Sequence, residues 1–208
     1  MGRWLILGLL MAAGLPTRAE EVERVLALVN GVPILASDAE LAEVAGLVPR
    51  LPNESEADYR RAVVEALIAL ELRFQDLERS RLVERLSPDL ETAWHRVVAN
   101  AGGEDALSAK LAASGLSEGD LRRLVRRAAA VEAYVAKRFA ASLRVTGEEV
   151  EAAYREAFSS RSEASPAPPL DQVRPQLEAL VREKKLLSEV ERWTRELESR
   201  SEVTRYLR

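Results

Sequence analysis

Residues 22–38 read VERVLALVNGVPILASD, and this stretch decides the fold. The apolar run at 25–29 is too short for a typical helix and is rich in residues that favour β-strands. Asn30-Gly31 follows it, the pair best suited to a two-residue type I′ turn, because both turn positions require positive φ. A second apolar run follows the turn at 32–35. The sequence therefore predicts a β-hairpin, which other elements must cover because an isolated hairpin is only marginally stable in water.

The register of this hairpin predicts where a third strand pairs. A two-residue turn places Val29 opposite Val32 as a hydrogen-bonded pair. The next pair, Leu28 and Pro33, is not hydrogen-bonded, so Pro33 points its missing N–H away from the hairpin. Proline is tolerated there only at a sheet edge, so any third strand must pair on the free side of the first strand. The best candidate is 202–207 (EVTRYL), and we expect it to join the two chain ends in a three-stranded antiparallel sheet.

The remainder of the chain is typical of a helical protein. It is 47% hydrophobic and 31% charged but only 5% aromatic, and Ala, Leu, Arg and Glu dominate, all of them good helix formers. The predicted fold class is therefore mostly α, a helical module whose small antiparallel sheet joins the N-terminal hairpin to the C-terminal strand. Six or seven helices are expected from the apolar periodicity, at about 38–47, 53–79, 88–101, 104–114, 117–139, 146–158 and 170–197.

Capping residues mark the ends of these helices. Side-chain acceptors at a helix start satisfy free N–H groups, and a glutamate three residues on completes a capping box. Glycine after the last turn adopts the left-handed conformation that ends a helix. We expect N-caps at Ser37, Asn53, Ser87, Ser117 and Thr146, and helix stops at Gly102 and Gly115.

The first nineteen residues are predicted to be a secretory signal rather than part of the fold. Arg3 gives a short positive start, residues 4–15 form an apolar core, and Ala19 is a small residue at the expected cleavage point. The alternative, a membrane anchor, is less favoured because the apolar run is shorter than the roughly 20 residues that span a bilayer. Cleavage removes Arg3 and Arg18 and no acid, which changes the net charge from −4 to −6. We therefore expect a periplasmic protein with no stable membrane insertion and no nucleic-acid partner.

Residues able to carry out catalysis are scarce. The sequence has one histidine, His95, and no cysteine, which excludes disulfides, thiol catalysis and thiolate metal sites. No histidine or carboxylate cluster has metal-ligand spacing, and no glycine-rich loop follows a strand. His95 follows Trp94 within a predicted helix and is interpreted as a solvated surface residue. We expect no catalytic residue, no cofactor and no metal.

Three segments occur in a distinctive order. They are ERVLALVNGVPILASDAELA at 23–42, RVTGEEVEAAYREAF at 144–158, and DQVRPQLEALVREKKLLSEVERWTREL at 171–197, the last followed by the third strand. Their order and spacing resemble the N-terminal chaperone module of the SurA family of periplasmic proteins. The resemblance covers 20–208 and implies one module of that type. In that family one or two parvulin-type prolyl isomerase domains lie between the second and third segments.

The chain departs from the family between those two segments. Only the stretch 159–169 (SSRSEASPAPP) lies there, whereas a parvulin domain needs on the order of a hundred residues. We expect 159–169 to be a flexible loop, and the isomerase activity is not carried over. The resemblance then implies a non-enzymatic, ATP-independent chaperone that binds unfolded polypeptides, outer-membrane proteins among them, through apolar helix surfaces. The alternatives are a non-catalytic scaffolding subunit of a cell-envelope complex and, less favoured, a prolyl isomerase.

Large aromatic side chains are the best candidates for client contact, because aromatic residues dominate binding surfaces. Each of them has the alternative of belonging to the core, and composition does not distinguish an open groove from a closed core. The sequence names neither the client nor the oligomeric state. The candidate substrate-binding residues are Phe74, Trp94, Tyr134, Phe139 and Trp193.

Overall fold

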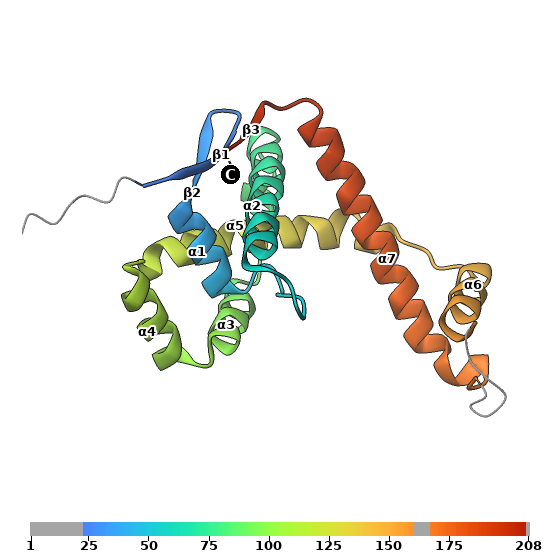
Figure 1. Cartoon of the computed structure of the whole chain (residues 1–208). Helices are drawn as coiled ribbons and strands as arrows, with labels where there is room; N and C mark the ends of the chain where they lie inside the picture. The colour runs from blue at the N-terminus through green and yellow to red at the C-terminus, as the bar shows by residue number, and fades with distance from the viewer. Residues whose placement is uncertain (1–22, 160–166, 207–208) are drawn as a thin grey trace, which may run out of the picture.

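The computed structural model describes residues 23–159 and 167–206. Within them the chain forms seven α-helices, two short 3₁₀ helices and three β-strands (Figure 1), which confirms the predicted fold class. The predicted signal at 1–19 lies outside the described residues, as do residues 160–166 of the predicted loop. The elements are β1 (Val25–Val29), β2 (Val32–Leu35), α1 (Ala36–Ala45), α2 (Glu56–Arg79), η1 (Val83–Arg85), α3 (Leu90–Ala101), α4 (Glu104–Ser114), α5 (Glu118–Arg138), η2 (Ala140–Ser142), α6 (Gly147–Phe158), α7 (Leu170–Glu198) and β3 (Val203–Arg205).

The sheet has the strand order β2-β1-β3, with β1 in the centre. Val29 lies opposite Val32 and Leu28 lies opposite Pro33, as predicted. The turn residues between β1 and β2 have φ angles of 49° and 80°, the positive values that a type I′ turn requires. β3 pairs antiparallel to β1, with Leu28 opposite Thr204. Pro33 therefore lies on an edge strand, and the C-terminal strand completes the sheet from the other side, as predicted.

The main hydrophobic core lies between the sheet and helices α1 to α5. Helix α2 is at its centre, and it packs against α1, α5, α7 and β1. Its Val63, Val64 and Leu72 are fully buried. Burying an aliphatic side chain of this size contributes about 1.5–3 kcal/mol, so α2 supplies a large part of the stabilising contacts.

A second, smaller hydrophobic cluster lies where α6 packs on the first half of α7, away from the sheet (Figure 1). Helix α7 runs from this cluster to the main core, where Trp193 and Leu197 are buried. Between these two contact regions, from 182 to 192, no residue of α7 is fully buried. One long helix thus links two separate hydrophobic clusters. The helical periodicity of the sequence did not show that its apolar face is divided between them. The second cluster is formed by Val150, Ala153, Leu177 and Val181.

Helix α1 begins two residues earlier than predicted. The cap position is Leu35, whereas Ser37 lies inside the first turn and does not cap. The carboxylate of Asp38 accepts a hydrogen bond from the Leu35 N–H at 2.8 Å. The helix starts early because β2 passes directly into it, without the loop residue that a side-chain cap requires.

Helices α2 and α3 begin two residues later than predicted. Their N-caps are Ser55 and Asp89 rather than Asn53 and Ser87. Both stretches contain several possible acceptors, so the composition alone did not decide which of them caps the helix. The other predicted ends are confirmed, namely the N-caps Ser117 and Thr146, the second with its capping box, and the left-handed stops Gly102 and Gly115.

Candidate functional site

Three of the five aromatic candidates form one cluster that attaches α7 to α5 and α2. The ring centroids of Tyr134 and Trp193 are 5.2 Å apart, and those of Phe139 and Trp193 are 5.7 Å apart. The indole Nε1 of Trp193 donates to Asp76 Oδ2 at 3.3 Å. Tyr134 and Trp193 are buried, and Phe139 is half-buried. The cluster therefore holds α7 on the main core, and its contact with a client stays a prediction.

The other two candidates, Phe74 and Trp94, are covered by arginines of α5. The Arg122 guanidinium carbon lies 3.8 Å from the Trp94 ring centroid, and that of Arg127 lies 4.7 Å from the Phe74 ring centroid. Such cation–π contacts contribute about 0.5–1 kcal/mol at exposed sites. Both aromatic side chains are half-buried and pack against the main core. Phe74 and Trp94 also remain predicted client contacts, although none of the five candidate side chains is fully exposed.

A polar network connects the hairpin turn with α2, α5 and the C-terminal segment. Glu71 of α2, the one charged residue buried within the described part of the chain, pairs with Arg127 of α5. Glu71 Oε1 also accepts from Gln75 Nε2 at 2.7 Å, and Gln75 Oε1 accepts from Asn30 Nδ2 at 2.7 Å. Asn30 Oδ1 in turn accepts from the Glu202 N–H at 2.9 Å. These fixed partners give the buried carboxylate a structural role.

Asp38 lies beside this network at the start of α1. Burial raises the pKa of the Asp38 carboxyl above its ordinary value of 3.8, because desolvation disfavours the charged form. The hydrogen bond from the Leu35 N–H acts in the opposite direction, as does the charge of Arg127, whereas Glu23 and Glu71 add to the increase. The ionised form of Asp38 therefore destabilises the fold at neutral pH.

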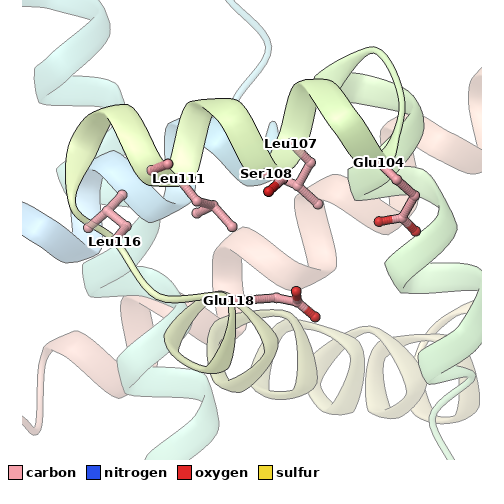
Figure 2. A pocket seen from close by; sticks show the side chains of 7 residues that line it. Glu104, Leu107, Ser108, Leu111, Leu116 and Glu118 are labelled. Atoms are coloured by element: carbon pink, nitrogen blue, oxygen red, sulfur yellow. The ribbon is translucent and has the colours of Figure 1, made fainter.

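An open hollow of about 250 Å³ lies between α4 and the first turn of α5 (Figure 2). Its floor consists of Leu107 and Leu111, one helical turn apart on α4 and only 2% and 5% exposed. More exposed residues form its walls and rim. We call it the α4–α5 hollow, and its lining residues are Glu104, Leu107, Ser108, Leu111, Ala112, Leu116 and Glu118.

The turn after α4 gives this hollow its shape. Gly115 has a φ of 67°, a left-handed conformation that ends α4 at little cost only for glycine. The N–H of Leu116 then donates to the Leu111 carbonyl at 2.9 Å, which keeps Leu116 beside the floor. Ser117 caps α5, so Glu118 is the first residue of that helix and faces α4 across the hollow (Figure 2).

The two carboxylates of the hollow differ in their partners. Glu118 Oε1 accepts from Arg122 Nε at 2.6 Å, and the same arginine stacks on the Trp94 ring. Glu104 has no ion pair within 23–159 and 167–206. Figure 2 shows both carboxylates on the same open space below α4. The α4–α5 hollow thus combines a leucine floor with a negatively charged rim.

Helix α7 presents a second apolar surface that begins beside the second hydrophobic cluster and continues towards the main core. Leu180 is 40% exposed and Leu187 is 56% exposed. Residues seven apart lie on the same face of a helix, so these two leucines form one exposed stripe. Single exposed leucines are common on protein surfaces, and the stripe is therefore a weaker candidate than the hollow.

The described residues bring together few groups with catalytic or metal-binding chemistry. His95 is exposed, as predicted, and lies 3.8 Å from Glu91 on its own helix. Nowhere in the described ranges do three or more His, Cys, Asp or Glu side chains converge as metal ligands would. None of the described helices has a stretch long and apolar enough to cross a bilayer.

Comparison with known proteins adds no assignment. No protein-family model matches the chain, and no curated protein matches it. The surfaces described above and the sequence resemblance are therefore the only indications of function.

The sequence reasoning missed the α4–α5 hollow. A signal was present, because Leu107 and Leu111 are spaced by one helical turn and Gly115 is followed by a further leucine. This pattern also occurs in helices that are simply packed against a core. Only the path of the chain after Gly115 shows that an open hollow remains between these leucines and the start of α5.

Proposed function

We propose that this protein is an ATP-independent chaperone of the periplasm that binds unfolded polypeptides without catalysing a reaction. The observation that carries the proposal is the α4–α5 hollow, an open site with a leucine floor that is large enough for one side chain at a time. A site of this kind suits many sequences, since it requires one side chain rather than a folded surface. The resemblance of the three segments to the SurA chaperone module supports the same function.

The geometry favours weak and reversible binding. The floor leucines expose little area, and Leu180 and Leu187 add only a narrow stripe. Apolar burial contributes about 25 cal/mol per Å², so contact with so little exposed apolar area gives weak binding rather than a permanent complex. Weak binding allows a client to be released without ATP.

A paired substitution on α4 tests the proposal. Ala112 lines the hollow, whereas its neighbour Ala113 does not, and both are exposed on the same helix. In Ala112→Trp the indole fills the hollow, and in Ala113→Trp the same side chain extends into solvent. The assay is the light scattering of a chemically denatured outer-membrane protein diluted into buffer with the wild type or either variant.

We expect the wild type and Ala113→Trp to suppress aggregation, and Ala112→Trp to suppress it less. Circular dichroism and the urea midpoint of each variant confirm that the fold is retained. Failure of the wild type to suppress aggregation of several unrelated clients would refute the chaperone function. Binding of a single stoichiometric envelope protein would instead support a scaffolding subunit, and prolyl-peptide turnover above background would support an isomerase.

A further inference from the structure

We propose that the α4–α5 hollow binds a lysine or arginine side chain of the unfolded polypeptide, with the alkyl stem on the leucine floor and the cationic head between Glu104 and Glu118. This inference rests on the proposed function and specifies which client residues the site selects. It predicts a preference for client segments that carry basic residues.

The dimensions of the hollow favour a single long side chain. Its volume of about 250 Å³ is below the roughly 300–1,000 Å³ of sites that enclose drug-sized ligands. The floor offers only the small exposed parts of Leu107 and Leu111. A lysine or arginine stem is narrow enough to use such a floor, because these side chains lay their methylene groups on apolar surface while the charged head stays in water.

The rim favours a cation over an uncharged side chain. Glu104 has no ion pair among the described residues, and Glu118 engages Arg122 through Oε1. The Arg122 guanidinium carbon lies 3.8 Å from the Trp94 ring centroid, and Arg122 is not among the residues that line the hollow. A purely apolar side chain placed there would desolvate both carboxylates, and Glu104 would have no charged partner to compensate for the lost water, which is unfavourable.

The position of Glu104 in the first turn of α4 has a structural explanation as well. Acidic residues stabilise helix N-termini through the helix dipole, and Asp105 occupies the same turn. Only Glu104 lines the hollow, however, and Asp105 does not. The two residues therefore form a matched pair in which the dipole effect is shared and the proposed binding role belongs to Glu104 alone.

The test uses three unstructured Gly/Ser peptides that differ at one position, which is arginine, norleucine or glutamate. Each is titrated into the ¹⁵N-labelled full chain and followed by the amide shifts of residues 104–118. We expect the arginine peptide to shift these amides and to bind about two- to fivefold more tightly than the norleucine peptide, the range given by an exposed ion pair. Glu104→Gln should remove this difference, whereas Asp105→Asn should retain it.

Two results would overturn the inference. One is norleucine binding at least as tightly as arginine, and the other is an equal effect of Glu104→Gln and Asp105→Asn. Suppression of aggregation by the wild type separates the two proposals. If it persists while the arginine preference is absent, only the inference about the hollow fails. If it is absent while the hollow still selects arginine, the chaperone function fails and the basic side-chain site stands.

Discussion

Removal of the C-terminal strand is the most informative perturbation of this fold. Truncation after Arg200 deletes β3 and leaves the β3-facing side of β1 without a partner. Every second residue on that side of β1 directs its backbone groups towards β3. The Asn30 N–H donates to the Glu202 carbonyl at 2.8 Å, and the Tyr206 N–H donates to the Leu26 carbonyl at 2.9 Å. Leu28 lies between these positions, so it exchanges both bonds with Thr204, its partner in the register.

The expected loss follows from these contacts. Four backbone groups of β1 and the turn lose their partners, and each hydrogen bond contributes about 0.5–1.5 kcal/mol net when water can replace the partner. The ion pairs of Arg205 with Glu65 and Glu198 add little because these side chains are about a third or more exposed. The released tail regains conformational entropy, which offsets part of the loss. We expect a decrease of about 2–3 kcal/mol in the free energy of unfolding, a large fraction of the roughly 5–15 kcal/mol of a typical domain.

Urea denaturation followed by circular dichroism measures this loss. The control is truncation after Tyr206, which keeps every β3 contact named above and should leave the midpoint unchanged. The truncation after Arg200 should lower the midpoint clearly relative to this control. Equal midpoints and slopes for the two truncated chains would show that β3 is dispensable and that the sheet does not stabilise the module.

Three further predictions follow from the attachment of α7, from the buried carboxyl and from the N-terminal sequence. Trp193→Ala should lower the unfolding free energy by about 3–5 kcal/mol, because it removes the ring that holds α7 on the main core, and a urea midpoint close to that of the wild type would contradict this. Asp38→Asn should raise stability at pH 7, since the raised pKa means that the folded state favours the protonated, uncharged form. The gain should shrink as the pH falls through the raised pKa of the folded state and should be largely lost below the ordinary value of 3.8, where the unfolded wild-type chain is protonated as well; urea titrations at pH 7 and pH 3.5 check the sign. Export should yield a mature chain that begins at Glu20, and mass spectrometry that finds intact Met1 in a membrane fraction would refute it.

The sheet could be predicted almost completely because its information is local. Asn30-Gly31 determines the turn, the turn determines the register, and the missing N–H of Pro33 identifies the edge. The place of the C-terminal strand then follows by elimination, although nothing in its own sequence specifies β1 as its partner. The irregularity in pairing between Val25 and Ala27 was not predicted, because it depends on how the strand passes into α1.

The aromatic side chains show the limit of the same reasoning. Trp193 was a candidate contact because of its size, and size equally favours burial. The structure places it against Tyr134 and hydrogen-bonds its indole to Asp76, a partner 117 positions away in sequence. A sequence pattern gives the face of a helix on which a residue lies, but not what covers that face. The α4–α5 hollow was missed for the same reason, since its openness is set by the direction of α5 rather than by any residue that lines it.

The proposed function, the binding of unfolded chains, requires that the protein avoid pairing with them as a β-sheet, and the edge strand β2 meets this requirement. Along an antiparallel strand every second residue directs its N–H outward, and in β2 these residues are Pro33 and Leu35. Pro33 has no N–H, and the Leu35 N–H donates to Asp38. The outer edge of β2 therefore offers no free donor, which is an effective block to edge-to-edge aggregation. The burial that raises the pKa of Asp38 accompanies the position from which its carboxylate accepts the Leu35 N–H. The protection of this sheet edge explains why the fold keeps a carboxylate that lowers its stability at neutral pH.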